Sequence, residues 1–392
     1  MLNNLYKCKG WIVKNSKIGK SSIQVQLVID GRYRFFCPTC HTRLLTHSYH
    51  DIYVRDLPLA SHQVQLVCQL MQGWCPSCRK YHTCRPRELH PSMGYTWRLM
   101  RLISEMFRFV PSWMLANLFD ISASSIRRID HVVLATTLPP VNLSNLKAIL
   151  IDEKYLGKKN GFVSLVLNAH TGEPVYMAPG KSVDSMDGFF SMLTEQQCQS
   201  IQVVGIDRSN AYKAAVEKYL PHAAICFDHF HIISNLNDAL DQVRREELHK
   251  ASEMNRRLIS NSRYLLLKGR ENVAEDKVNR LNQLLLSNRK ISDGYVLKEQ
   301  FREIYKAKDV NGGIWRLSEW LRMTRASSIE PLKRFAKGLL KNFNEVINFF
   351  KFRISSGKIE AANASISRIQ AKTCGLFNIP YLFLKLRQSY YQ

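Results

Sequence analysis

The chain has 392 residues and 45% of them are hydrophobic, so it is long enough for two or more domains with sizeable cores. Lys and Arg number 56 against 32 Asp and Glu, and the formal net charge of +24 favours nucleic acid as a partner. No stretch approaches the roughly 18 apolar residues of a membrane span, and residues 1–16 lack a signal-peptide core. We therefore expect a soluble, cytoplasmic protein that has no membrane partner and keeps its thiols reduced.

Residues 1–92 are predicted to form a zinc-binding module, because they hold two Cys-x-x-Cys pairs. Four thiolates on two turns can supply the tetrahedral ligand set that structural Zn²⁺ prefers. The two pairs are separated by more residues than in common zinc fingers, and the segment 51–67 is predicted to form strands between them. The alternative is a set of unrelated buried thiols. A redox role is disfavoured because no βαβ pattern lies beside either pair. The predicted zinc ligands are Cys37, Cys40, Cys75 and Cys78.

Residues 93–140 are predicted to form a helix-turn-helix domain that ends in a linker, Leu138-Pro139-Pro140. A helix over 95–109 is indicated by apolar residues at helical spacing, and the segment 112–129 follows as two helices and a turn. Ser122 is the expected N-cap of the second helix, and Asp120 takes the turn position that requires a left-handed backbone. The apolar residues of the first helix are Leu99, Leu102, Ile103 and Met106.

The second helix of this motif carries polar residues that would face a DNA groove or its phosphates. The alternative is that they form an ordinary solvated helix face. These candidate DNA-binding residues are Ser124, Ser125, Arg127 and Arg128.

Residues 141–231 are predicted to be the first part of an α/β catalytic core. Two short, β-branched apolar runs are typical of buried strands, and they end at Asp152 and Asp207, which places both carboxylates at strand ends. The pattern also predicts a hairpin, two helices and a last strand, which together make a mixed sheet. Their ranges are 161–177 for the hairpin, 186–196 and 211–219 for the helices, and 224–227 for the strand.

Beyond these strands the pattern becomes helical. Residues 232–350 are predicted to be an all-helical insertion, whose many Lys and Arg suit a phosphate backbone or form a solvated surface. Residues 351–392 are predicted to return to the core with a helix that carries Glu360, because serines and a glycine precede an Ala- and Ile-rich pattern there.

Asp152, Asp207 and Glu360 form the candidate catalytic set. Carboxylates from two strand ends and one helix can converge on two Mg²⁺ ions, which prefer oxygen ligands and clamp the attacking and leaving oxygens of a phosphoryl transfer. This pattern predicts a two-metal nuclease core of the ribonuclease H type. The alternative is that each acid is a helix cap or turn residue. Asp228 and His231 either help to order DNA or are a helix cap and an ordinary polar residue, and Asp228 is the rival third ligand.

The arrangement resembles the DDE transposases of bacterial insertion sequences, and in particular the ISL3 group, over nearly the whole chain. The resemblance is carried by the two Cys-x-x-Cys pairs, the helix-turn-helix and four further motifs. Two local departures, His41 where glycine is usual and the segment 71–74, concern the zinc module and not the core. The four motifs are residues 151–153, 205–212, 227–231 and 356–363.

The resemblance implies that Asp152, Asp207 and Glu360 are the catalytic triad and hold two Mg²⁺ or Mn²⁺ ions. It also implies a bacterial transposase, acting as a homo-oligomer, that binds terminal inverted repeats through residues 1–131 and then cleaves and transfers DNA strands into target DNA. Two other readings stay open. One is a non-catalytic zinc and helix-turn-helix regulator with a degenerate nuclease fold, and the other is a structure-specific DNA nuclease.

Overall fold

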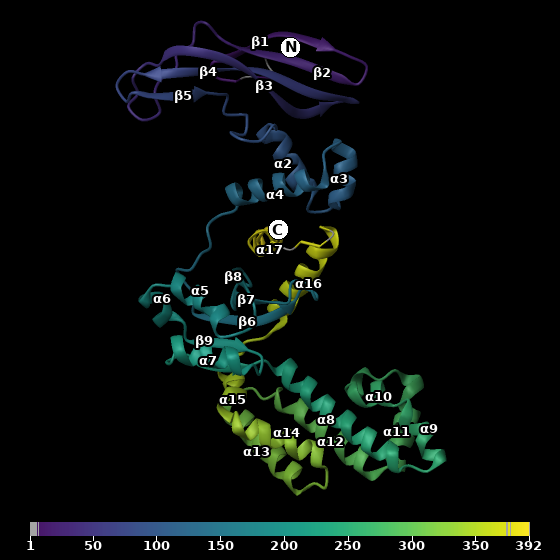
Figure 1. Cartoon of the computed structure of the whole chain (residues 1–392). Helices are drawn as coiled ribbons and strands as arrows, with labels where there is room; N and C mark the ends of the chain where they lie inside the picture. The colour runs from purple at the N-terminus through teal and green to yellow at the C-terminus, as the bar shows by residue number, and fades with distance from the viewer. Residues whose placement is uncertain (1–5, 7, 374, 377, 392) are drawn as a thin grey trace. The chain divides into compact units, whose positions relative to one another are not determined.

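The computed structural model describes residues 6, 8–373, 375–376 and 378–391 (Figure 1). The chain divides into two compact units. The first comprises residues 1–138 with 371–375, and the second comprises residues 139–370 with 376–392. None of the helices described is long and apolar enough to cross a membrane.

The first unit begins with a mixed five-stranded sheet. Its order is β1-β2-β4-β3, and β5 also pairs with β4; only β2 and β4 run parallel. Apolar side chains on one face, among them Val25, Leu27 and Leu66, alternate with exposed ones and form its core. The two long strands, β3 and β4, cover most of the segment 51–67, where strands were predicted between the cysteine pairs. The strands are β1 (Trp11–Ile18), β2 (Ser22–Ile29), β3 (Leu45–Leu59), β4 (His62–Cys75) and β5 (Lys80–Cys84).

Three helices complete the first unit, and they confirm the predicted helix-turn-helix geometry. Ser122 caps the last helix by accepting a hydrogen bond from the Ser125 N–H, and Asp120 adopts the left-handed conformation with φ 50°. The predicted first helix forms, and of its apolar residues Leu99 and Ile103 are buried whereas Leu102 is 40% exposed. The helices are α2 (Trp97–Met106), α3 (Ser112–Phe119) and α4 (Ala123–Thr137).

The second unit is built on another mixed five-stranded sheet, in the order β10-β9-β6-β7-β8. β7 is antiparallel to both of its neighbours, whereas β6, β9 and β10 run parallel. Asn168 fixes the predicted hairpin turn, since its side chain accepts the backbone N–H groups of His170 and Thr171. The strands are β6 (Ala148–Tyr155), β7 (Phe162–Asn168), β8 (Pro174–Pro179), β9 (Val203–Ile206) and β10 (Ala224–Phe227).

Three helices are interleaved with these strands. The single helix expected over 186–196 was wrong: two helices form there, because Thr194 and Gln197 build a capping box that starts a new helix. The apolar side chains of α5 and α7 join Ile149, Ile151 and Val204 in the main core on one face of the sheet. The helices are α5 (Asp184–Met192), α6 (Glu195–Ser200) and α7 (Asn210–Tyr219).

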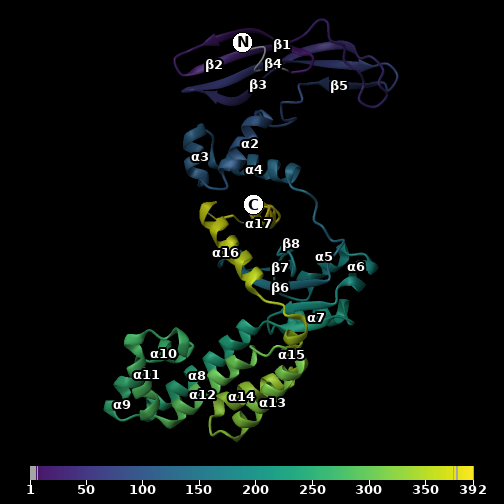
Figure 2. The same ribbon diagram turned by 180° about the vertical axis from the view of Figure 1, so that it is seen from behind.

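The described residues from His229 onward form helices and no strand, as the sequence periodicity indicated. Both views show α8, α12, α13 and α14 side by side (Figure 2). Later helices return to the sheet: α15 contacts β10, where Asn348 donates a hydrogen bond to the Ile225 carbonyl, and α17 packs on β8. The long helices are α8 (His229–Lys250), α11 (Glu275–Ser287), α12 (Arg289–Ile304), α13 (Val310–Ala326), α14 (Glu330–Lys341), α15 (Phe343–Phe352), α16 (Gly357–Lys372) and α17 (Ile379–Tyr390). The shorter ones are α9 (Glu253–Ser260), α10 (Arg263–Leu267) and the 3-10 helix Arg270–Asn272.

Candidate metal centres

Three aspartates lie in one row across the second sheet. In the parallel strands Ile151 is paired with Ile206, and Ile206 with Phe227. Each of these apolar residues belongs to the main core, and each is followed directly by an aspartate. Because successive side chains of a strand point to opposite faces, the aspartates are directed away from that core. The three aspartates are Asp152, Asp207 and Asp228.

Helix α16 brings Glu360 to the same face. Glu360 lines one pocket together with the three aspartates and His231. Gly205 permits this approach, because a Cβ there would lie 3.1 Å from Ile354, just ahead of the helix, and 2.6 Å from Leu150. The structure therefore brings the predicted acids together in one pocket, although Glu360 lies more than 150 positions after both Asp152 and Asp207 in the sequence.

The site differs from expectation at Asp152, which does not end its strand. β6 continues to Tyr155, because it still pairs with β7 after β9 has ended at Ile206. Asp207 follows the end of β9 as predicted. Asp152 thus lies where the parallel pairing of β6 with β9 ends, and not where β6 itself ends.

Hydrogen bonds orient the carboxylates. Asn363, one helical turn beyond Glu360 on α16, donates from Nδ2 to Oδ2 of Asp152 at 2.8 Å. Ser356 donates to Oε1 of Glu360 at 2.9 Å, and the Ser209 N–H donates to Oδ1 of Asp207 at 2.9 Å. Asn363 has no assigned role in the sequence-based prediction, although it lies on the same helix face as Glu360.

Burial and mutual repulsion act on the acids of this pocket. Desolvation raises the pKa of Asp152, and the nearby charge of Asp207 raises it further against the Asn363 hydrogen bond. Glu153 is raised in pKa for the same reasons, first by burial and then by the charges of Asp207 and Asp152. The main cause of both raised pKa values is burial of the carboxylates, which a bound cation would offset.

Asp228 combines the two roles that the sequence left open. Its Oδ1 accepts the Phe230 N–H and caps α8, while its side chain also lines the acid pocket. His231 is half exposed, with Nε2 at 3.7 Å from Oδ2 of Asp228. Capping alone therefore does not account for Asp228, since only one of its two oxygens is used for it.

The donor set fits divalent cations. Three buried side-chain oxygens in or beside the pocket have no hydrogen-bond partner: Oδ2 of Asp228, Oε2 of Glu153 and Oδ1 of Asn363. Unpaired buried oxygens are costly unless a further ligand satisfies them, and hard oxygen donors are the ligands that Mg²⁺ selects.

The four thiols predicted to bind zinc form a second centre, in the first unit. Their sulfur atoms lie within 4.8 Å of one another, and no other His, Cys, Asp or Glu group in the described part of the chain is as tightly gathered. Hydrogen bonding with Thr42 lowers the pKa of Cys40 to about 6, and so favours the thiolate that zinc requires.

Both cysteine turns have the same backbone signature. His41 and Arg79, which directly follow Cys40 and Cys78, adopt positive φ values of 59° and 51°. The left-handed conformation is unfavourable for such residues, so its occurrence at equivalent positions indicates that the turns are shaped to direct the sulfur atoms inward. The unusual His41 thus keeps the geometry that a glycine would provide.

The candidate DNA-binding residues all lie on α4. Ser124 and Arg128 are exposed, whereas Ser125 and Arg127 are half-buried. A connection that sequence analysis missed supports this motif from outside: Arg55 on β3 donates from its guanidinium to the backbone carbonyls of Phe119 and Asp120. The turn of the motif is therefore tied to the sheet.

Comparisons with known proteins agree with this architecture. Residues 149–386 match the sequence profile of a transposase family, the DDE transposases of the ISL3 group. This span exceeds half of the chain, and the chain belongs to that family. The transposase for insertion sequence element IS1001 of Bordetella parapertussis is 24% identical over 340 residues, which cover 86% of this chain and 84% of that protein.

A second relative is the transposase for insertion sequence element IS1557 of Mycobacterium tuberculosis. It is 23% identical over 266 residues, which cover 62% of this chain and 60% of that protein. The predicted family resemblance is confirmed. Membership implies DNA as a partner and the use of divalent metal ions.

Proposed function

We propose that the protein cleaves DNA at the ends of its own insertion sequence and joins those ends to target DNA. The observation that carries this proposal is the convergence of Asp152, Asp207 and Glu360 in one pocket. A family profile alone does not say whether a copy keeps its chemistry. An intact set of acids with raised pKa values at Asp152 and Glu153 favours an enzyme over a regulator with a degenerate site.

The topology supports a ribonuclease H-like core. A sheet in the order β8-β7-β6-β9-β10, with β7 antiparallel to its neighbours, suits that fold. It places the acid of the central strand β6 beside the acid that follows β9, and α16 adds a third from over the sheet. The all-helical segment between β10 and α16 is proposed to be an insertion into this core.

The acids of the pocket have different proposed roles. Asp152, Asp207 and Glu360 would hold two Mg²⁺ or Mn²⁺ ions, and the bound ions would supply Lewis-acid stabilisation of the attacking and departing oxygens of the phosphodiester. Asp152 is oriented by Asn363, and Glu360 by Ser356. No general base such as His231 is needed, because the carboxylates act as ligands. His231 and Asp228 are proposed accessory residues at the rim of the pocket.

The first unit is proposed to read the terminal inverted repeats. The cysteine cluster would hold one structural Zn²⁺ ion, and α4 would present Ser124, Ser125, Arg127 and Arg128 to DNA. The proposed domains are residues 1–92, 93–140, 141–231, 232–350 and 351–392, and the active form on DNA is proposed to be a homo-oligomer.

The test is a cleavage assay on duplex DNA that joins one end of the element to its flanking sequence. Asp152→Ala, Asp207→Ala and Glu360→Ala should each abolish Mg²⁺- or Mn²⁺-dependent cleavage and leave end binding nearly intact. Glu195→Ala, which changes an exposed acid in the first turn of α6, serves as the control and should retain activity. Wild-type protein that binds the ends but never cuts them in either metal would refute the proposal.

Asp228 is tested separately in the same cleavage assay, because it lies in the same row across the sheet as Asp152 and Asp207. Asp228→Asn keeps the Oδ1 that caps α8 and removes the charge, so it separates capping from metal binding. We expect this variant to remain active and Glu360→Gln to be inactive. The reverse result would make Asp228 the third ligand.

A further inference from the structure

Arg208 directly follows Asp207, and its guanidinium lies against helix α14. A Cβ added to Gly338 of that helix would lie 3.0 Å from Nη2 of Arg208. The glycine therefore leaves room for a cation from the sheet to lie on the outer surface of the helix. This contact links the acid pocket to a part of the helical segment more than 120 residues away in sequence.

Helix α14 has a basic outer face. Its buried side consists of Leu332, Phe335, Ala336 and Leu339, which pack into the main core. On the opposite side Arg334, Lys337 and Lys341 are exposed, and Gly338 lies between them. Residues spaced by three, four and seven positions share one face of a helix. Arg208 therefore completes a row of four cations, here called the basic stripe: Arg208, Arg334, Lys337 and Lys341.

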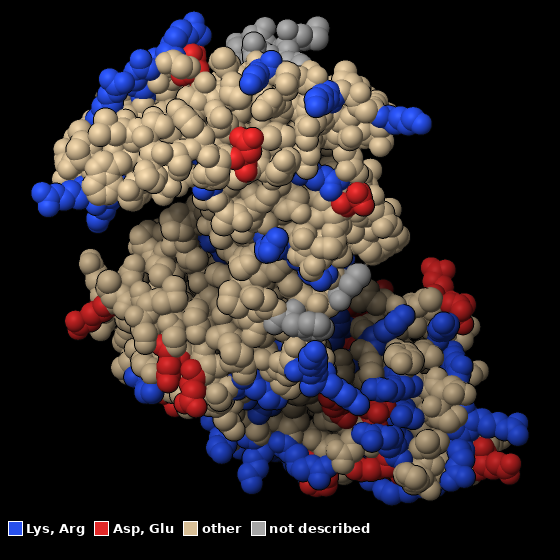
Figure 3. All heavy atoms as spheres, turned by 45° about the horizontal axis from the view of Figure 1, so that its top comes forward, with Lys and Arg blue, Asp and Glu red and all other residues tan. Residues whose placement is uncertain are grey.

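The charge of the basic stripe is not neutralised within the protein. None of its four residues takes part in any ion pair or side-chain hydrogen bond that the structure describes, whereas the adjacent Lys333 pairs with Glu330 at 3.0 Å. Figure 3 shows Lys and Arg gathered densely over the helical part of the chain, with fewer acids between them. An array of like charges on one helix face has a cost in self-repulsion, which binding of a polyanion removes.

We propose that the basic stripe binds the phosphodiester backbone of the DNA duplex whose strand enters the acid pocket. This inference rests on the proposed function and adds to it the surface that holds the DNA next to the reacting bond. Arg334 and Lys341 are about 10 Å apart along the helix axis, which matches the rise of about three base pairs. Arg208 is the member adjacent to Asp207, and so it contacts the phosphates nearest to the cleaved bond.

The first experiment measures the salt dependence of binding to the element-end duplex, with the full chain carrying Asp152→Ala to prevent cleavage. Replacing Arg334, Lys337 and Lys341 by Ala should lower the slope of log affinity against log salt by about 2–3, since each phosphate contact contributes about 0.9. The matched control is Lys277→Ala with Arg280→Ala on α11, two exposed cations without a described ion pair. This control should change the slope little.

The second experiment uses Gly338→Ala in the otherwise unchanged protein. Alanine in the middle of a helix favours the helix, so this variant should melt at the same or a higher temperature. The added Cβ would lie 3.0 Å from Nη2 of Arg208, so the guanidinium should shift by a few tenths of an ångström, and the cleavage rate should fall less than it does in Arg208→Ala. In a double variant the two changes should not add, because both act on the same contact.

The outcomes separate the two proposals. An unchanged salt slope in the triple variant, or additive losses for Gly338→Ala and Arg208→Ala, would overturn the basic stripe. The expected fall in slope in the triple variant, together with wild-type protein that binds the duplex but does not cleave it, would overturn the proposed function alone. Absence of any binding to the duplex by the wild-type chain would overturn both.

Discussion

Asn363 donates a hydrogen bond from Nδ2 to Oδ2 of Asp152 at 2.8 Å, across 211 positions of sequence. The same side chain has a buried Oδ1 without a hydrogen-bond partner. Asn363 thus connects α16, which carries Glu360, to the central strand that carries Asp152. Asn363 therefore lies where it would orient Asp152, the proposed metal ligand, and residues in that position influence metal affinity strongly.

Asn363→Ala should weaken Mn²⁺ binding by about 10-fold or more, because Asp152 loses the donor that orients it. The measurement is a Mn²⁺ titration followed by electron paramagnetic resonance, which does not depend on DNA cleavage. Ser367→Ala, one turn further along the exposed side of α16, is the control and should bind Mn²⁺ as the wild type does. Equal Mn²⁺ affinity in all three proteins would show that Asn363 has only a packing role.

The strands of the site can be predicted from the sequence, but their register in the sheet cannot. Short β-branched runs ending in Asp152 and Asp207 were recognisable, because buried parallel strands are continuously apolar. The register that puts Ile151 beside Ile206 is a tertiary property, and no local pattern encodes it. The same holds for the approach of Ile354 to Gly205, although an isolated glycine in a strand is a general sign of such close packing.

One error could have been avoided from the sequence. Thr194-Glu195-Gln196-Gln197 has the spacing of a capping box, which starts a helix at a position where a single continuous helix was predicted. By contrast, nothing local distinguishes Leu102 from Leu99 and Ile103. Only the packing of α2 against α4 decides which side of the helix is buried.

The cysteine cluster predicts about one Zn²⁺ per chain, because structural sites use four ligands. Replacing Cys75 and Cys78 by Ser should remove the zinc and destabilise the first unit, as measured by elemental analysis and thermal unfolding. Cys198→Ser, in the second unit, should leave zinc content unchanged. Folded, zinc-free wild-type protein would contradict the assignment.

Glycine at the positive-φ positions after Cys40 and Cys78 should stabilise the protein. His41→Gly and Arg79→Gly should each raise the free energy of unfolding of the zinc-loaded protein by up to about 1 kcal/mol, because glycine adopts positive φ without steric cost. The comparison is Thr39→Gly, which lies within the first turn but not at a positive φ and should destabilise. A loss of stability in both His41→Gly and Arg79→Gly would mean that these side chains make interactions worth more than the strain.

The DNA-reading role of α4 is tested with Arg127→Ala and Arg128→Ala together. If both residues contact phosphates, the double variant should bind the terminal repeats more weakly, and its salt slope should fall by about 2. Asp130 and Ser104, which form a buried hydrogen bond at 2.6 Å below this surface, should keep the fold intact. Unchanged affinity and slope would show that neither arginine contacts DNA.

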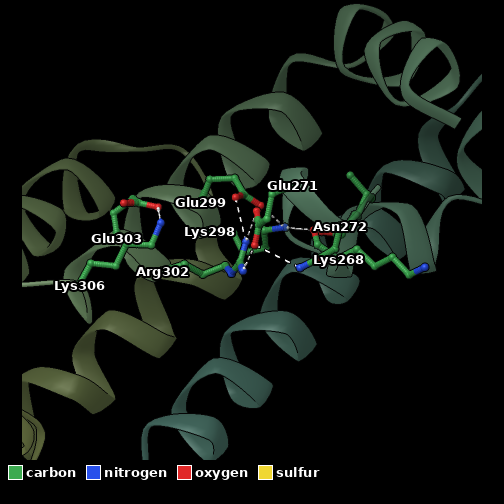
Figure 4. A network of polar contacts seen from close by, with 9 residues as sticks. Lys268, Glu271, Asn272, Lys298, Glu299, Arg302, Glu303 and Lys306 are labelled. Carbon is green, nitrogen blue, oxygen red and sulfur yellow. Dashed lines mark hydrogen bonds and ion pairs between the residues drawn. The ribbon is translucent and has the colours of Figure 1, made fainter. Parts of the chain in front are cut away.

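Lys298 is fully buried in the helical segment and donates from Nζ to the carbonyls of Leu266 and Lys268, at 2.8 and 2.6 Å (Figure 4). Lys298→Met fills a similar volume but leaves both carbonyls without this donor, so it should lower the free energy of unfolding by about 2–4 kcal/mol. Lys306→Met removes an exposed partner of Glu303 and should cost less than about 1 kcal/mol. Urea denaturation of both variants distinguishes a buried anchor from a surface pair.

The raised pKa of Asp152 predicts a dependence of stability on pH and on metal. Desolvation is the main cause of the raised pKa, and it acts against the charged form. The folded protein therefore binds a proton more tightly than the unfolded chain, whose Asp pKa is about 4. Stability falls as pH rises from that value through the higher folded pKa, and it stays reduced at neutral pH.

Asp152→Asn removes this cost, so without divalent ions it should be more stable than the wild type at pH 7 and lose that advantage toward pH 4. Saturating Mg²⁺ or Mn²⁺ should reverse the order, because ions bound only by the folded wild type stabilise it by about 2.7 kcal/mol at 100 times the dissociation constant. Asp276→Asn, an exposed acid in the first turn of α11, is the control and should show neither effect. If Mg²⁺ and Mn²⁺ stabilise Asp152→Asn as strongly as the wild type, Asp152 is not a metal ligand.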